Sequence, residues 1–282
     1  MNRQIAWISS IDPRNKAAVD LLETTMRKFY SESPTYYADI DFATAAWAAD
    51  HVNKDIAARA RESLRILEIG CGAARILDYF PDLAPHYTGV DFSAVQLANN
   101  RSRHPSATFV QLGDSGNLPL QSDTYDCVFS LYVLEHAVRP QRFLDESVRV
   151  TGSGGWWLMR CPDFLGYSRM SSQRCGYTAG TGREKIRRGD VWDAVVTAWD
   201  SRVRVPLKCR AIRRQIARRD GVHGFFVNTQ PTCLTDAFGA DRDAVYLTYK
   251  EEICWHLAPH VTFQECPVSE ATDDIYLVAK KR

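Results

Sequence analysis

The sequence lacks several features that would place it in a specialised class of protein. No long apolar run occurs among its 282 residues, which argues against a membrane-spanning helix. The opening MNRQIAWISSIDPRNK has no continuous apolar stretch, so we expect no signal peptide and a cytoplasmic location. The eight cysteines are scattered without a C-x-x-C pair, which argues against a zinc site and against a disulfide scaffold. We therefore expect reduced thiols and no bound metal.

An excess of charge is also missing. The chain has 35 basic and 34 acidic residues, so the molecule as a whole is not expected to bind a polyanion, and a nucleic-acid partner is not favoured. Hydrophobic residues make up 45% of the chain, enough for a large core, and no internal repeat is visible. The length indicates one large domain or a domain with an insertion.

What the sequence does contain, from residue 64 onward, is an alternation of short apolar runs and helix-like segments. This alternation is typical of parallel strand–helix–strand units, in which both faces of a sheet are covered. We expect strands at 64–69, 86–93, 107–114, 125–136 and 154–162, and helices at 73–83, 93–103 and 139–150. Near the end we expect a helix at 250–257 and strands at 261–268 and 273–281.

The segment 163–244 interrupts this rhythm and is rich in arginine. Between residues 163 and 224 there are fourteen basic and six acidic residues, a charge of +8 that leaves −7 for the rest of the chain. The spacing predicts two helices, one with an apolar face of Trp192, Val195, Val196, Trp199 and Val203, and one with Leu207, Ala211, Ile212 and Ile216.

Segregated charge hints at an anionic partner for this segment. A carboxylate or phosphate on a small substrate, an acidic carrier protein, RNA and a membrane surface remain open, as does a simple solvated helix face. Membrane contact by the basic helix 207–219 ranks lower because its apolar face is narrow. Residues 16–60 are also expected to be mainly helical.

A glycine turn and two acidic residues follow successive predicted strands. LRILEIGCG, at residues 64–72, ends a strand in a turn where glycine permits close approach of backbone to a ligand. Asp91 ends the second strand, where a carboxylate can accept both hydroxyls of a ribose. Asp114 ends the third and can accept from an exocyclic amine such as that of adenine. Each has an ordinary turn or capping role as an alternative, but together they favour a nucleotide-type ligand.

These motifs, with YDCVFSLYVLEH and GSGGWWLMRCP, resemble class I S-adenosylmethionine-dependent methyltransferases, and most closely the small-molecule branch. The resemblance implies an α/β fold: a Rossmann-like, seven-stranded, mostly parallel sheet with helices on both faces, an antiparallel terminal hairpin and a helical insertion. It divides the chain into an N-terminal helical cap (1–60), a cofactor-binding core (61–162), a basic insertion or substrate lid (163–244) and terminal strands that complete the core (245–282).

The resemblance also implies a site for S-adenosylmethionine, with S-adenosylhomocysteine as product. Its expected contacts are Glu68, Gly70, Cys71 and Gly72 on the methionine and ribose side, Asp91 at the ribose, Phe92, Asp114 and Ser115 at the adenine, Leu131 and Tyr132 at the methionine, and Tyr37 closing the site. Ala74 stands where the family usually has a third glycine, which leaves the start of the following helix uncertain. The missing G-x-x-G argues against a dinucleotide.

Three residues are candidates for catalysis. Methyl transfer needs a base only when the acceptor holds its proton tightly, as a hydroxyl does. His136 after the fourth strand, His223 near the end of the insertion and Asp163 after the fifth strand could provide a base or contact the acceptor.

We expect a small, anionic or sugar-like acceptor, methylated at oxygen or, second, at nitrogen, in natural-product or cell-envelope biosynthesis. The alternatives are an RNA methyltransferase and a non-catalytic binding protein.

Overall fold

The computed structural model describes residues 5–32, 50–113, 117–166, 170–218, 224–232, 242–264 and 274–282. Four residues expected at the site, Tyr37, Asp114, Ser115 and His223, lie outside these ranges.

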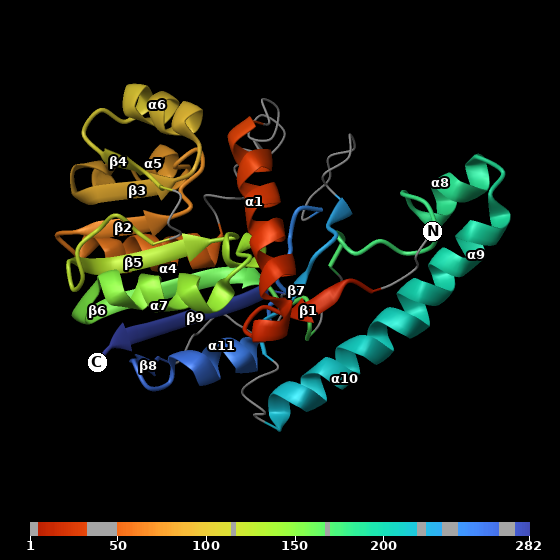
Figure 1. Ribbon diagram of the computed structural model, residues 1–282. Coiled ribbons are helices and arrows are strands. Elements are labelled where there is room, and N and C mark those ends of the chain that lie inside the picture. The colour runs from red at the N-terminus through yellow and green to blue at the C-terminus, as the bar shows by residue number, and fades with distance from the viewer. Residues whose placement is uncertain are drawn as a thin grey trace.

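The described residues contain a seven-stranded sheet with the order β4-β3-β2-β5-β6-β9-β8 (Figure 1). Its strands are β2 (Ile66–Ile69), β3 (Tyr87–Asp91), β4 (Thr108–Gln111), β5 (Tyr125–Leu131), β6 (Thr151–Pro162), β8 (Val261–Phe263) and β9 (Asp274–Lys281). Neighbouring strands pair in parallel, except that β9 is antiparallel to β6 and to β8. The predicted fold class is confirmed. The chain order reverses between β2 and β5, the place where ligands bind in such sheets.

Helices cover both faces of this sheet because its strands alternate their side chains between two clusters. On β6, Trp157 and Met159 pack in a cluster with α1 (Lys16–Glu32), α7 (Pro140–Val150) and α11 (Lys250–Leu257). Leu158 between them packs in a second cluster, with α4 (His51–Arg61), α5 (Ile76–Tyr79) and α6 (Ala94–Arg103). The near-continuous apolar runs in the sequence follow from burial of both faces.

Two predicted boundaries near the glycine turn were wrong. The helix expected at 73–83 is the single turn α5 followed by a 3₁₀ helix, η2 (Pro81–His86). Pro81 has no N–H to continue an α-helix and disfavours helical backbone at Phe80, whose φ is −129°. The strand expected at 125–136 ends at Leu131, because Tyr132 has a φ of 55° and turns the chain into the 3₁₀ helix η3 (Leu134–His136).

The insertion contains α8 (Gly182–Arg187), α9 (Val191–Trp199), a π-helical turn η4 (Asp200–Arg204) and α10 (Val205–Ala217). The last three run on as one long helix (Figure 1).

A two-stranded sheet was not predicted from the sequence. In it, β1 (Trp7–Ser9) pairs antiparallel with β7 (Phe226–Asn228), near the 3₁₀ helix η1 (Pro13–Asn15). Each strand has three residues, too few for an alternating pattern to be recognised.

Candidate functional site

A cleft of about 500 Å³ lies at the carboxyl ends of β2, β3 and β5. Residues that follow these three strands form one side of it. The other side comes from α1 and from the segment between η3 and α7. A cavity of this size, at the point where strand order reverses, is a typical small-molecule site.

The glycine turn after β2 forms part of the cleft wall. Gly70 and Gly72 have φ values of 72° and 45°, a region that glycine adopts without steric cost. The N–H groups of Gly70 and Cys71 donate to Val90 O at 2.8 and 3.0 Å, which ties the turn to β3. A Cβ on Gly70 would lie 2.5 Å from the Val133 side chain, whereas a Cβ on Gly72 would meet no atom within 4 Å. The turn therefore needs glycine at Gly70 for packing and presents bare backbone to the cleft at Gly72.

Asp91 at the end of β3 fixes this turn from the other side. Its Oδ2 accepts from Gly72 N–H at 2.9 Å, and its Oδ1 accepts from Ser93 N–H at 2.9 Å. The carboxylate is buried and lines the cleft. A carboxylate has about four acceptor positions, so each oxygen can accept a further bond from a ligand hydroxyl.

Glu68 lies beside Asp91 at the base of the cleft. Tyr87 OH donates to Glu68 Oε2 at 2.5 Å. Burial raises the pKa of Glu68 to about 8; the Tyr87 bond opposes this shift and the charge of Asp91 adds to it. At neutral pH the free protein therefore keeps Glu68 protonated.

Three more predicted residues line the cleft. Leu131 and Tyr132 come from the end of β5, and Phe92 follows β3, with the Arg27 guanidinium 5.8 Å from the Phe92 ring centroid. Tyr132 OH donates to Asp274 Oδ2 at 2.5 Å, which holds the left-handed residue in place.

Ala74 also has a positive φ, 50°, and is fully buried. Where the family usually has a third glycine, the backbone is therefore strained, two residues before α5 begins.

On the far side of the cleft, His136 lies beside a buried carboxylate. Its Nδ1 is 3.3 Å from Oδ2 of Asp243, and its Nε2 is 3.9 Å from Glu135 Oε1. Tyr30 OH of α1 donates to the same Asp243 oxygen at 3.1 Å, and its ring packs edge-on against the imidazole. His136 and Tyr30 line the cleft, so these groups meet where an acceptor would be bound.

The sequence did not identify Asp243 or the contribution of α1. Glu23, Met26, Arg27 and Tyr30 of α1 line the cleft, although the expected closing residue was Tyr37. These four positions follow helical spacing, but the neighbouring sequence does not show which part of the protein this side of the helix faces. Leu112 and Gly113 could have been found, since they directly precede the predicted Asp114.

The third catalytic candidate, Asp163, does not line the cleft. It is buried, and its Oδ1 accepts from Gly166 N–H at 2.8 Å in a local turn. Burial raises the pKa of Asp163 to about 6, and the Gly166 bond lowers it. Among the described residues of 163–244, none is part of the cleft wall, and Asp243 is connected to it through His136 and Tyr30. The expected role of the insertion as a lid has no support from these residues.

The residues present fit S-adenosylmethionine. Bare backbone at Gly72 allows close approach, Asp91 can accept ribose hydroxyls, Phe92 offers a ring face to a base, and Glu68 suits a cation once it is ionised. No group of three or more His, Cys, Asp or Glu side chains suited to a metal occurs in the described part of the chain.

Comparisons with known proteins agree with this geometry. Residues 67–159 match the family described as "Methyltransferase domain". A "Probable S-adenosylmethionine-dependent methyltransferase" of Mycolicibacterium smegmatis is 31% identical over 103 residues, 36% of this chain and 40% of that protein. A "Ubiquinone biosynthesis O-methyltransferase" of Maricaulis maris is 33% identical over 105 residues, 36% of this chain and 40% of that protein. The chain thus spans less than half the length of these relatives.

Among solved structures, an S-adenosylmethionine-dependent methyltransferase of Mesorhizobium loti is 14% identical, with a TM-score of 0.48 over 83% of this chain and 100% of that one. The sheet order, the cleft and the family match define one class. Residues 67–159 thus match a methyltransferase domain, within a sheet that has the fold of class I S-adenosylmethionine-dependent methyltransferases, whose cofactor is S-adenosylmethionine.

Proposed function

We propose that this protein transfers a methyl group from S-adenosylmethionine to a hydroxyl oxygen of a small molecule, with His136 as the base. The observation that carries the proposal is the placement of His136 in the cleft, with its Nδ1 3.3 Å from the buried carboxylate of Asp243. A base is needed for a hydroxyl acceptor but not for an amine that is already neutral.

S-adenosylmethionine would bind on the side of the cleft that Gly72, Asp91 and Phe92 form. When bound, S-adenosylmethionine supplies an electrophilic methyl group on a positively charged sulfur. Asp91 would accept ribose hydroxyls while it holds Gly72, and Phe92 would pack against the adenine. Leu131 and Tyr132 would contact the methionine part. These groups position the reactants and exclude water, which is most of what a displacement with an activated methyl requires.

His136 would take the acceptor proton. The Asp243 carboxylate is closer to Nδ1, at 3.3 Å, than Glu135 is to Nε2, at 3.9 Å. This would favour the tautomer that carries its proton on Nδ1, so Nε2 would receive the acceptor proton. Tyr30 fixes the same carboxylate oxygen through its hydroxyl and packs against the ring, which limits rotation of both groups. The resulting imidazolium would be stabilised by Asp243.

The cleft supports a small polar acceptor, sugar-like or anionic. Its wall has four arginines and four acidic side chains, so the formal charges balance and polar groups of either sign can be matched. Arg139, near the start of α7, is already paired with Asp20 and Glu23 of α1. Arg142, one turn further along α7, also lines the cleft and suits an anionic group. The relative in Maricaulis maris is named an O-methyltransferase, which supports oxygen over nitrogen as the attacked atom.

The test is S-adenosylhomocysteine formation with fractions of a small-molecule extract. On an active fraction, His136→Asn should lower kcat about 10²- to 10⁴-fold at unchanged cofactor affinity. Asp243→Asn should lower it less and shift the pH profile, and His260→Asn, at an exposed position, should leave it unchanged. No turnover with any fraction despite measured cofactor binding, or full activity of His136→Asn, would refute the proposal.

A further inference from the structure

The arm, residues 182–218, projects on the far side of α1 and the small sheet from the large sheet (Figure 1). Its helix α9 differs from a usual amphipathic helix, which buries its apolar residues and exposes its polar ones. Its buried positions are Asp193, Ala194, Val196 and Thr197, whereas the large apolar side chains of Trp192, Val195 and Trp199 are 69%, 55% and 58% exposed. These three exposed residues follow helical spacing and form one apolar stripe.

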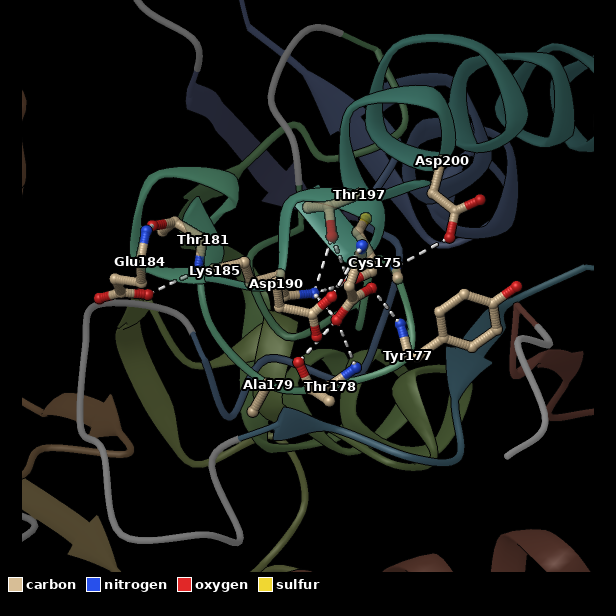
Figure 2. A network of polar contacts seen from close by, with 12 residues as sticks. Cys175, Tyr177, Thr178, Ala179, Thr181, Glu184, Lys185, Asp190, Thr197 and Asp200 are labelled. Carbon is tan, nitrogen blue, oxygen red and sulfur yellow. Dashed lines mark hydrogen bonds and ion pairs between the residues drawn. The ribbon is translucent and has the colours of Figure 1, made fainter. Parts of the chain in front are cut away.

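The polar side chains on the buried side of α9 form an ion pair and hydrogen bonds within the protein (Figure 2). Lys185 of α8 is buried, with its Nζ 3.1 Å from Asp193 Oδ2 and 2.7 Å from the Thr197 hydroxyl, to which it donates. Asp193 also accepts from the N–H groups of Tyr177 and Thr178 at 2.6 and 3.0 Å. Burial opposes ionisation of Asp193, but the Thr178 hydroxyl and these amides hold its pKa below the ordinary value. The network fixes which side of α9 faces outward.

The stripe continues onto α10. A π turn contains about one extra residue, so the path from Trp199 to Leu207 is close to two α-helical turns and brings both residues to one side. Leu207 is 55% exposed, and Arg210 and Arg214 follow it at helical spacing and are exposed too. The opposite side of α10, including Ile212, packs in a cluster with β1 and β7. The outer side is therefore apolar along α9 and basic along α10.

The surface charge of the arm is strongly positive. It has eight exposed Lys and Arg side chains against two exposed acids, Glu184 and Asp190, and both acids cap helices. Aromatic side chains beside basic ones on an exposed helix are the pattern of proteins that lie in the interface of an anionic bilayer.

We propose that the arm binds the surface of a lipid bilayer with anionic headgroups. Trp192, Val195, Trp199 and Leu207 enter the interface, and the arginines contact lipid phosphates. In the part of the chain that the structure describes, no helix is long and apolar enough to cross a bilayer, so the contact is peripheral. This surface lies outside the methyl-transfer cleft, and the proposal does not depend on the acceptor.

Charge and shape favour lipid over other occupants. A symmetric pairing of two arms would bring like charges together around the stripe, which opposes a second copy. Duplex nucleic acid would match the arginines but offers no apolar surface for Val195 or Leu207. A bilayer interface matches both, and the indole of tryptophan is suited to its boundary between apolar and wet layers.

The test is flotation of the full chain with vesicles of phosphatidylcholine alone or mixed equally with phosphatidylglycerol. The protein should float with the mixed vesicles and not with the neutral ones. Trp192→Ser with Trp199→Ser should reduce binding at least tenfold. Arg210→Glu with Arg214→Glu should reduce it more than about 30-fold, since each charge near the surface is worth roughly fivefold.

Matched controls use exposed residues away from the arm. Lys54→Glu with Lys250→Glu reverses the same charge on α4 and α11, and Trp255→Ser removes an exposed tryptophan of α11. These variants should float like the parent chain, and all variants should keep cofactor affinity in calorimetry. Equal binding to neutral vesicles, no binding to either type, or a loss of self-association instead of lipid binding in the tryptophan variants would each overturn the proposal.

Discussion

Replacing Glu68 by glutamine should stabilise the free protein, and by an amount that grows with pH. The carboxyl group is buried at the base of the cleft with a pKa raised from its ordinary 4.5 to about 8, mainly by burial. A raised pKa in the folded state contributes stability only while both states are protonated, below the unfolded value. That contribution is lost as pH rises towards the folded value, because the unfolded chain ionises and the folded one does not. Glutamine stays neutral in both states and avoids this loss.

The magnitude follows from the two pKa values. Between about pH 5 and about pH 8, the difference in unfolding free energy between variant and parent should grow by about 1.4 kcal/mol per pH unit. At about pH 7 it should reach about 3 kcal/mol. At low pH the difference measures only the change of group and its bond to Tyr87, so the slope isolates the ionisation.

The assay is denaturant unfolding of parent and variant across this pH range, with the cofactor absent. Glu252→Gln is a matched control at a second buried glutamate. Burial raises its pKa to about 6, opposed by bonds from Phe225 N–H and the Tyr246 hydroxyl. The difference for Glu252→Gln should level off near about pH 6, at about 2 kcal/mol. A pH-independent difference for Glu68→Gln would refute the assignment of a neutral carboxyl in the free protein.

Three other changes test the cleft and its supports. Asp91→Ala should weaken S-adenosylmethionine binding by about 1–3 kcal/mol in calorimetry, and an unchanged dissociation constant would exclude the ribose contact. Gly70→Ala should destabilise the fold and abolish cofactor binding, since its Cβ would overlap a side chain at 2.5 Å. Gly182→Ala, outside the cleft, would bring its Cβ no closer than an ordinary 3.7 Å to its neighbour and should do neither. Arg160→Met leaves two carboxylates without their ion-pair partner and should cost about 3–5 kcal/mol in unfolding experiments. Arg61→Met, at a half-exposed pair, should cost less than about 1 kcal/mol.

Most of the cofactor side could be predicted from the sequence. Gly70, Gly72 and Asp91 lie on turns directly after strands, and parallel strands bring their carboxyl ends to one edge of a sheet. The position in the chain therefore already places these residues together. The exact ends of elements were less accessible: Tyr132 adopts a positive φ against the strand propensity of its neighbours, because its hydroxyl bond to Asp274 holds it.

The acceptor side could not be predicted in this way. His136 was recognisable by its position after a strand, but Asp243 lies 107 residues further along the chain and follows no motif. Likewise α1 contributes Tyr30 and Arg27 only because its other side packs against the sheet. Such contacts depend on how elements that are distant in the sequence pack together, so the local spacing of residues does not predict them.

The insertion shows most clearly what the sequence determines and what only the tertiary structure determines. By itself the sequence determined that this segment is helical and basic, and it predicted one apolar face of Trp192, Val195, Val196, Trp199 and Val203, because these properties depend on spacing of about 3.6 residues per turn. The structure divides that face, since Val196 is buried while Trp192, Val195 and Trp199 are exposed. Only the tertiary structure decided which face is buried. The Lys185–Asp193 ion pair and its hydrogen bonds draw the polar side of α9 inward, since buried charges must be paired, and so leave the tryptophans outside. Local periodicity defines a face, and long-range partners decide where it points.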